Sequence, residues 1–441
     1  MAERIGVLVI GGGGREHALG WKIAQSRRCG RLHAAPGNGG LAAIAECHPV
    51  PASDVAGLAE LARDLRVGLA VVGPEAPLAA GLADRLRAAG VRVFGPSAAA
   101  ARIESSKAYA RELMARHGVP QPSYRRFRAL EAAEAHLAAL EASGTRRAVV
   151  KASGLAAGKG AIVCEDLAAA AAAARELLVD RCLGEAGEEI LIEERLAGEE
   201  VSLLVLTDGR SVLPLLPAQD YKRARDGDAG PNTGGMGSHA PAPALTPALL
   251  REAVERIVRP VLAGLARDGA PFQGCLYAGL IRTPGGLRVI EFNCRFGDPE
   301  AQAILPLLDT DLLELLLAAA QGDLGSREVR WRPGCAVSVV LASSGYPGTF
   351  TAGHPISGLE EAAVIPGVHV FHAGTARRDG SVITAGGRVL NVTGTGRSFA
   401  GAIAAAYAGV DRIRFEGRQF RTDIGARVRE AGEPPQEKET C

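Results

Sequence analysis

Residues around position 292 have the types and the spacing of a magnesium site. Glu291 and Asn293 are separated by one residue in a strand-like segment, so both side chains project from one face while Phe292 points into the core. Carboxylate and amide oxygens suit Mg²⁺, whose other ligands are water and substrate phosphates. Arg295 follows on the same side and could bind a carboxylate or phosphate through two parallel hydrogen bonds. This strand end is therefore a candidate metal site.

A lysine beside a glycine-rich loop forms a candidate phosphate site. The apolar runs 148–151 and 161–164 predict an antiparallel hairpin whose tip is the loop 153–160. The loop imitates a P-loop but lacks its first glycine and its Ser or Thr after the lysine, and it leads into a strand instead of a helix. Backbone donors of such a flexible lid can cover phosphates, and Lys151 can place a charge on them. The alternative is a solvated lysine at a strand edge, which the adjoining loop disfavours.

The loop Gly11-Gly12-Gly13-Gly14-Arg15 lies between an apolar run and an apparent helix. Its backbone N–H groups and the helix N-terminus could hold an anion. The dinucleotide fingerprint G-x-G-x-x-G fails, because Glu16 or His17 occupies its last position, and Pro36-Gly37-Asn38 stands where a ribose-binding carboxylate is needed. The pattern favours a phosphate ligand over a nicotinamide cofactor. The alternative is that the glycines serve only a tight turn.

Two further segments could contact ligands. Residues 193–200 join two strands through a short hinge whose backbone could meet an adenine edge, although by itself the segment reads as a charged turn. Residues 217–243 show neither strand nor helix periodicity, and loops of that length in compact domains are usually functional or disordered. This one contains Asp220 and GPNTGGMG (230–237) and has no low complexity or charge run, which favours function.

The surrounding elements alternate in a way that predicts the fold. Strand, loop and helix repeat over the first hundred residues, which is typical of a parallel sheet with ligands at the carboxyl ends of its strands. The middle region adds predicted strands at 189–194, 200–207, 275–281 and 287–292 and a helix at 305–320. From residue 333 the pattern indicates a separate α+β unit.

Composition excludes several classes of protein. The 441 residues carry 50 Lys+Arg against 49 Asp+Glu, a net charge of +1, which argues against a nucleic-acid-binding protein that relies on a basic surface. Charges interrupt every long apolar stretch before about 18 residues, so no membrane span is expected. The eight cysteines are scattered without a CxxC pair and read as reduced thiols. We expect a cytoplasmic protein that binds neither nucleic acid nor membrane.

The chain resembles the ATP-grasp superfamily in the order of three features. These are a lysine before a glycine-rich hairpin, a Glu-Glu hinge and a Glu-x-Asn strand. Longer strings resemble the phosphoribosylamine–glycine ligases (glycinamide ribonucleotide synthetases) from roughly Glu3 to Gly425, with some details most similar to the ligase domain of the animal trifunctional purine enzyme. Tyr221, where His is common, is a mild departure near the expected substrate. The strings include IGGGGREHAL (10–19), KASGLAAGKG (151–160), GPNTGGMG (230–237) and IEFNCRFGDPE (290–300).

The resemblance implies a multidomain α/β and α+β fold. An N-terminal parallel-sheet α/β domain is expected at 1–104 and an ATP-grasp core at 105–325, with a small hairpin lid at about 122–192. A C-terminal α+β domain would occupy 326–426, followed by a disordered tail at 427–441.

The resemblance also implies a reaction, in which ATP, glycine and 5-phosphoribosylamine give glycinamide ribonucleotide, ADP and phosphate in the second step of purine synthesis. Glycine's carboxylate is a poor electrophile, so it would first become an acyl phosphate, which needs positioning and charge neutralisation but no enzyme nucleophile. Other purine-pathway enzymes are possible partners.

Residue roles carry over by position. The metal, Mg²⁺ or Mn²⁺, would bind Glu291 and Asn293, and the residues expected to take part directly in catalysis are Lys151, Arg295 and Asp220. ATP would contact Lys107, Lys151, Gly154, Gly158, Lys159, Gly160, Glu193, Glu194, Leu196 and Glu200. Glycine and phosphoribosylamine would contact Gly13, Gly14, Arg15, Asn38, Glu75, Asp220 and Arg295.

Two alternatives remain open at this point. A different ATP-grasp ligase or a carboxylase would share the middle third of the chain but lack GPNTGGMG. A non-catalytic nucleotide-sensing domain would tend to lose its metal strand, whereas Glu291 and Asn293 are both present here.

Overall fold

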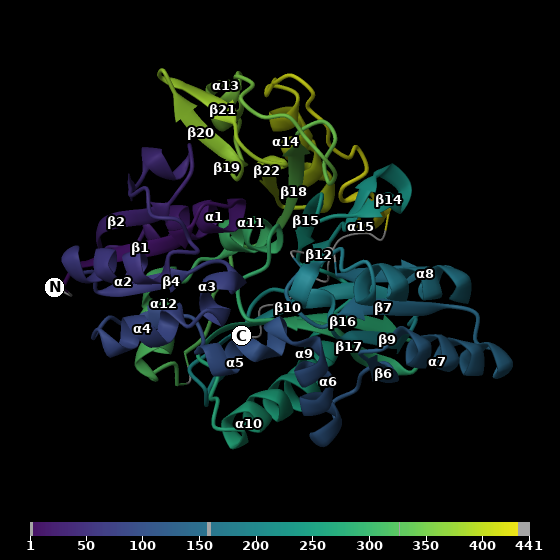
Figure 1. The fold of residues 1–441 in the computed structure, drawn as a ribbon. Helices are drawn as coiled ribbons and strands as arrows, with labels where there is room; N and C mark the ends of the chain where they lie inside the picture. The colour runs from purple at the N-terminus through teal and green to yellow at the C-terminus, as the bar shows by residue number, and fades with distance from the viewer. Residues whose placement is uncertain (1–2, 157–159, 326, 431–441) are drawn as a thin grey trace.

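The computed structural model describes residues 3–156, 160–325 and 327–430 (Figure 1). Four sheets of four or five strands organise this part of the chain, together with two small hairpins. None of the helices in these ranges is long and apolar enough to cross a membrane.

The N-terminal domain is built on a five-stranded parallel sheet of order β3-β2-β1-β4-β5, as predicted. The central strands are continuous apolar runs because helices cover both faces of the sheet. The helical segment that follows β4 is divided into two helices, because Gly81 takes φ +84° between them. The elements are β1 (Ile5–Gly11), α1 (Gly14–Ile23), β2 (Cys29–Pro36), β3 (Glu46–Cys47), α2 (Val55–Asp64), β4 (Leu69–Val72), α3 (Glu75–Ala79), α4 (Leu82–Ala88), β5 (Val93–Phe94) and α5 (Ala98–Ser105).

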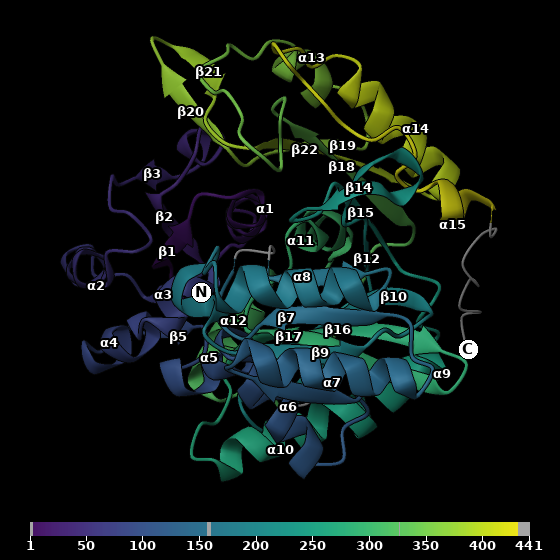
Figure 2. The same cartoon turned by 45° about the vertical axis from the view of Figure 1, so that its right-hand side comes forward.

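The lid is a four-stranded antiparallel sheet of order β6-β9-β7-β8. The predicted hairpin is its β7–β8 pair, so the lid is larger than a hairpin alone. Two helices lie in front of the sheet in Figure 2 and share a small apolar core with it. The elements are β6 (Tyr124–Phe127), α7 (Leu130–Ala142), β7 (Ala148–Ala152), β8 (Ala161–Cys164), α8 (Leu167–Leu178) and β9 (Ile190–Glu194).

A second antiparallel sheet, of order β11-β10-β16-β17, forms the floor beneath the lid. The helix predicted at 305–320 begins only at Leu312, where Asp311 caps it, and a short 3₁₀ turn precedes it. The elements are α6 (Lys107–Arg116), β10 (Glu199–Thr207), β11 (Val212–Pro214), α9 (Pro247–Ala253), α10 (Arg259–Arg267), β16 (Gly274–Thr283), β17 (Gly286–Asn293), α11 (Glu300–Ile304) and α12 (Leu312–Gln321).

The C-terminal sheet has the order β12-β15-β18-β22-β19, and two of its strands come from the middle of the chain. The segment 217–243 supplies β12 and β15, so the boundary predicted at 325/326 does not separate the sheets. The elements are β12 (Gln219–Asp220), β13 (Arg223–Arg225), β14 (Ala229–Asn232), β15 (Gly237–Ala240), β18 (Cys335–Ala342), α13 (Leu359–Ala363), β19 (Val368–His372), β20 (Thr375–Arg378), β21 (Ser381–Thr384), β22 (Arg388–Gly396), α14 (Phe399–Val410) and α15 (Ala426–Glu430).

The disordered tail was predicted to begin at residue 427, and this start is wrong. Helix α15 continues to Glu430, and Val428 is buried in the C-terminal core, which stabilises the helix. The remaining predicted tail, 431–441, lies outside the described residues.

Candidate active site

A cavity of about 1570 Å³ opens where the N-terminal domain, the lid, the floor sheet and the C-terminal sheet meet. Each part contributes charged side chains: Glu75 from the first domain, Lys151 from the lid, Glu291 from the floor and Arg388 from the C-terminal sheet. The cavity therefore brings together the segments that the sequence singled out separately.

Three charged side chains on the lid side form a buried ion-pair network, here called the lid network: Lys151 on β7, Glu193 on β9 and Arg111 on α6. Lys151 Nζ lies 2.9 Å from Glu193 Oε2, and Arg111 donates to both carboxylate oxygens at 2.7 and 2.8 Å. None of the three side chains is more than 5% exposed. Burial alone would raise the pKa of Glu193, but Lys151 and Arg111 more than offset it and hold that pKa below its ordinary value.

The lid network excludes the alternative that Lys151 is a solvated lysine at a strand edge. Its ammonium is buried and paired, and burial lowers its pKa although Glu193 opposes the shift. Removing Lys151 would leave Glu193 with Arg111 as its remaining cationic partner among the described residues.

A β-bulge connects the lid network to the strand that carries the metal candidates. The register of β16 and β17 shifts between the pairs Gly279–Glu291 and Leu280–Val289, so Ile290 is the extra residue. The Ile290 carbonyl accepts hydrogen bonds from Lys151 Nζ at 3.0 Å and from Arg111 Nη2 at 2.7 Å. The bulge thereby fixes the position of Glu291 relative to the lid.

Glu291 and Asn293 lie on the cavity face of β17, and Phe292 between them is 2% exposed within the core. Burial would raise the pKa of Glu291, but the surrounding cations, Lys222 and Lys151 foremost, lower it on balance, so this carboxylate is ionised at neutral pH. Within the described part of the chain, neither Glu291 nor Asn293 has a side-chain hydrogen bond or ion-pair partner. Two free oxygen donors on one face fit a hard divalent cation such as Mg²⁺ or Mn²⁺.

Arg295 sits between two carboxylates at the N-terminal side of the cavity. Its Nε lies 3.2 Å from Glu75 Oε2, and its Nη2 lies 3.4 Å from Glu104 Oε1. Burial would lower the pKa of Arg295, but Glu104 and Glu75 raise it on balance, so the guanidinium stays charged. The guanidinium is therefore held in place and has further N–H groups to offer an anionic ligand.

Asp220, on β12, is a second carboxylate of the cavity without a side-chain partner among the described residues. Its Oδ1 is buried and has no hydrogen-bond partner among the described residues. Burial, followed by the neighbouring Glu300, raises its pKa well above the ordinary 3.8. Glu300 itself accepts a hydrogen bond from Ser202 Oγ at 2.8 Å. Of the pair Asp220 and Glu300, Asp220 is the one whose side chain accepts no hydrogen bond from the described residues.

Tyr221 lies elsewhere than the sequence suggested. It is 3% exposed in the C-terminal core, where its hydroxyl accepts from the Gly425 N–H at 3.0 Å and contacts His239. It does not line the cavity, so this departure from the family pattern affects packing and not a substrate contact.

The opening loop turns tightly because it consists of glycine. Gly11 takes φ +123°, and a Cβ on Gly12 would lie 2.5 Å from the Gly37 carbonyl oxygen. Glu16 of α1 accepts hydrogen bonds from the Gly13 N–H at 2.7 Å and from Arg15 Nε at 2.6 Å. The loop is therefore shaped before any ligand arrives, and Arg15 faces the cavity.

Both polar atoms of the Asn38 side chain form hydrogen bonds with backbone groups. Its Nδ2 donates to the carbonyls of Gly12, Gly13 and His372, at 3.0, 3.3 and 2.8 Å, and its Oδ1 accepts from the N–H groups of Gly40 and Leu41. The residue fastens the opening loop to β19 instead of lining the cavity. Sequence reasoning expected it to contact substrate.

The hinge between β9 and β10 borders the cavity through Glu194, Leu196 and Glu200. The Glu194 carboxylate accepts from the Ser123 N–H at 3.2 Å, and Glu200 Oε2 lies 2.7 Å from Lys222 Nζ. Lys107, at the start of α6, lies on the same side of the cavity, with its Nζ 3.5 Å from the Gly154 carbonyl oxygen.

The predicted site residues fall into three groups. Gly158 and Lys159 lie outside the described residues. Gly13, Gly14, Asn38 and Gly154 are described but do not line the cavity. The residues that line the cavity are Arg15, Glu75, Lys107, Lys151, Gly160, Glu193, Glu194, Leu196, Glu200, Asp220, Glu291, Asn293 and Arg295.

Sequence reasoning missed Arg111, Glu104, Glu300 and Arg388, which also line the cavity. Glu104 lies three residues before Lys107, a predicted ATP contact, and Glu300 ends the motif IEFNCRFGDPE (290–300), so these neighbours could have indicated both. Arg111 and Arg388 have no local signal, because their partners, Glu193 and Asp298, are far away in the sequence.

Comparison with protein families matches three domains of phosphoribosylglycinamide synthetase: the N domain at residues 5–104, the ATP-grasp (A) domain at 105–301 and the C domain at 336–427. The phosphoribosylamine–glycine ligase of Pseudomonas aeruginosa is 48% identical over 97% of this chain and 99% of its own length. The trifunctional purine biosynthetic protein adenosine-3 of Gallus gallus is also 48% identical over 97% of the chain, which spans 42% of that longer protein.

Solved structures agree with these matches. The crystal structure of phosphoribosylamine–glycine ligase from Thermotoga maritima aligns with a TM-score of 0.83 and 31% identity over 95% of this chain and all of that one. The biotin carboxylase domain of Hydrogenobacter thermophilus 2-oxoglutarate carboxylase aligns with a TM-score of 0.72 at 17% identity over 95% of this chain and 92% of that one, a likeness of fold alone. The chain therefore belongs to the phosphoribosylglycinamide synthetase family of ATP-grasp ligases.

Proposed function

We propose that this chain joins glycine to 5-phosphoribosylamine at the expense of ATP, giving glycinamide ribonucleotide, ADP and phosphate through glycyl phosphate. The observation that carries the proposal is one cavity that gathers the lid network, the two free oxygen donors of β17 and the Arg295 guanidinium in a member of this family.

ATP would occupy the lid side of the cavity. Lys151 would face the phosphates together with Lys107 and the loop 153–160, including Gly154, Gly158, Lys159 and Gly160. The backbone of Glu194 to Leu196 would meet the adenine edge, and Glu200 would take the ribose hydroxyls. Both oxygens of the Glu193 carboxylate are paired with Lys151 and Arg111. The proposed role of Glu193 is therefore to position Lys151.

Glu291 and Asn293 would hold Mg²⁺ or Mn²⁺. The bound cation would neutralise charge on the transferring phosphoryl group. The supporting feature is the donor set itself, an ionised carboxylate and an amide that lack other side-chain partners among the described residues.

The remaining steps can be assigned to residues of the cavity. Arg295 would align the glycine carboxylate so that one oxygen attacks the γ-phosphorus in line with the leaving ADP. The amine of phosphoribosylamine would then attack the acyl carbon and displace phosphate. The Asp220 carboxylate, with a raised pKa and a free oxygen, is suited to accept the proton that the amine must lose.

The phosphate of phosphoribosylamine would lie at the opening loop. Gly13, Gly14 and Arg15 begin α1, whose first-turn N–H groups and dipole favour an anion. Asn38 would act by holding this loop in shape, and Glu75 would act beside Arg295.

The test is ADP release measured in a coupled assay with each substrate omitted in turn. The proposal expects release only when glycine and freshly generated phosphoribosylamine are both present. Equal release with bicarbonate in place of glycine would favour a carboxylase and reject the ligase.

We also propose a cytoplasmic location and association with other enzymes of purine synthesis. The second idea is motivated by the fused arrangement of the chicken relative. Cell fractionation and co-purification would test the two ideas separately.

A further inference from the structure

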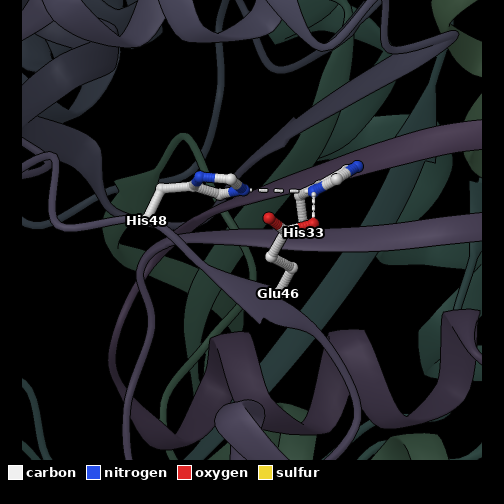
Figure 3. A group of neighbouring side chains, drawn as sticks. All are labelled: His33, Glu46 and His48. Carbon is white, nitrogen blue, oxygen red and sulfur yellow. Dashed lines mark hydrogen bonds and ion pairs between the residues drawn. The ribbon is translucent and has the colours of Figure 1, made fainter.

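Three side chains of metal-binding type meet at the edge of the N-terminal sheet, away from the cavity (Figure 3). His33 lies on β2 directly opposite Glu46 on the edge strand β3, and His48 follows two residues later. The His48 N–H donates to the Ala34 carbonyl at 2.9 Å, which keeps this residue alongside β2. Residues i and i+2 of a strand share a face, so Glu46 and His48 project toward His33 while Cys47 turns away.

The distances within the cluster fit a tetrahedral cation. His33 Nδ1 lies 3.1 Å from His48 Nε2 and 3.5 Å from Glu46 Oε2, and all three ligand atoms lie within 4.8 Å of one another. Zinc bonds of about 2.0–2.1 Å at tetrahedral angles place neighbouring ligand atoms about 3.3 Å apart. The two measured separations lie on either side of that value.

Hydrogen bonding alone can satisfy only one of the two close contacts of His33 at a time. Both close contacts involve His33 Nδ1, which carries at most one hydrogen. If that hydrogen points at Glu46, no hydrogen lies between His33 Nδ1 and His48 Nε2. If it points at His48, no hydrogen lies between His33 Nδ1 and the Glu46 carboxylate. If His33 Nδ1 has no hydrogen, it can accept one from His48 Nε2, and the contact with the Glu46 carboxylate at 3.5 Å is then the one without a hydrogen. A cation between the three atoms would satisfy all of them at once.

We propose that His33, Glu46 and His48 form a binding site for a divalent transition cation of the zinc class, with water as the fourth ligand. Two imidazoles and one carboxylate suit Zn²⁺ and its neighbours, whereas Mg²⁺ prefers an octahedral oxygen shell. The site is therefore chemically distinct from the oxygen donors at Glu291 and Asn293.

The cation would link the edge strand β3 to its neighbour β2. β3 is only two residues long and pairs with β2 alone, so its backbone contributes few hydrogen bonds. Linking it to His33 would hold the edge in register, and binding to the folded state alone raises stability by mass action.

The experiment uses the full chain with millimolar Mg²⁺ present to occupy oxygen-donor sites. Zn²⁺ is titrated in competition with a chromophoric chelator, Co²⁺ binding is followed by its visible absorption, and melting temperature is recorded with and without Zn²⁺. We expect one Zn²⁺ per chain, a tetrahedral Co²⁺ spectrum and a higher melting temperature.

Variants locate the site. His48→Gln and Glu46→Gln should each weaken Zn²⁺ binding by at least about tenfold, since losing even an outer partner of a ligand costs 10- to 100-fold. Glu46 has a side chain 62% exposed, so its replacement does not endanger the fold. Both variants should keep ADP-releasing activity. Cys47→Ser, on the opposite face, and Glu291→Gln, in the cavity, should bind Zn²⁺ as the unaltered chain does.

Three results would overturn the proposal. The unaltered chain could fail to bind Zn²⁺ at micromolar concentration. The affinity could be unchanged in both His48→Gln and Glu46→Gln. Zinc binding could instead be lost in Cys47→Ser or Glu291→Gln, which would place the cation elsewhere.

Discussion

The two sides of the cavity differ in whether their buried charged side chains have partners within the protein. In the lid network each charge has protein partners: Glu193 is held by Lys151 and by a bidentate Arg111. On the floor and C-terminal side, Glu291 and Asn293 lack side-chain partners among the described residues, and so does Asp220 Oδ1. The paired charges fix the geometry of the site in advance, whereas the unpaired oxygens are available to ligands. Of the unpaired carboxylates, Asp220 has a raised pKa and its charge therefore lowers stability, whereas nearby cations lower the pKa of Glu291. Replacing Arg111 should therefore cost stability, whereas replacing Asp220 should raise it.

The largest effect is expected from breaking the lid network at Arg111. Arg111→Met leaves the Val289 carbonyl without its side-chain donor and Glu193 with one cation in place of two. Removing one partner of a buried ion pair typically costs about 3–5 kcal/mol. Thermal and urea unfolding measure the loss, and Arg126→Met, at a half-exposed ion pair with Glu189, is the matched control. A similar small loss in both variants would contradict the network's structural role.

Lys151→Met should affect both activity and stability. Loss of a preorganised charge at the phosphates should lower kcat about 10²- to 10³-fold. The melting temperature should also fall, because Glu193 stays buried with Arg111 as its remaining partner. Steady-state kinetics and melts check the two effects. Normal turnover would place the ATP phosphates away from β7.

Glu291→Gln should lower activity and cost less stability than Arg111→Met, because Glu291 has nearby cations but no direct ion pair among the described residues. The substitution keeps the shape and one oxygen but removes the charge that attracts the cation, so kcat should fall about 10²-fold at ordinary Mg²⁺ and recover partly at high Mg²⁺. The assay is activity against Mg²⁺ concentration, with melts alongside. Unchanged metal dependence with a lower melting temperature would mean that the carboxylate is structural.

Phe292→Ala provides the control on the opposite face of the same strand. The ring is 2% exposed, so its loss should cost about 3–5 kcal/mol of stability, without magnesium rescue of the folded fraction.

The smallest effect is expected at Asp220. A carboxyl whose pKa is raised by folding binds its proton more tightly when folded, so it lowers stability as pH rises above the unfolded value near 3.8. Asp220→Asn resembles the protonated form. The ligand-free variant should therefore be more stable than the unaltered chain at pH 8, by about 1 kcal/mol, and the difference should shrink toward pH 4. Melts across this range test the sign, and a variant less stable at pH 8 would contradict it.

Local sequence patterns predicted the fold best where elements are made by near neighbours. The apolar run at β4 and the strand–helix alternation of the first domain needed no distant information. The segment 217–243 could not be predicted in the same way, because β15 is four residues long and pairs with β18, nearly a hundred residues later.

The candidate site likewise contains residues that local sequence predicted and residues whose position depends on distant contacts. Glu291 and Asn293 were predicted from strand spacing, since a two-residue period fixes which side chains share a face. The burial of Lys151 was missed because it depends on Arg111 and on a bulge in another sheet. Tyr221 was misplaced because proximity to Asp220 in sequence did not show that its side chain enters the C-terminal core.

The bond from Asn38 to the His372 carbonyl has a consequence for how such chains can change. Because the acceptor is a backbone oxygen, this bond depends on where residue 372 lies and not on its side chain. An insertion or deletion that shifts β19 by one residue would move that oxygen and loosen the glycine loop, which is close in space although distant in the sequence. Exchange of the C-terminal domain between relatives should therefore tolerate many substitutions along β19 but no change in its length.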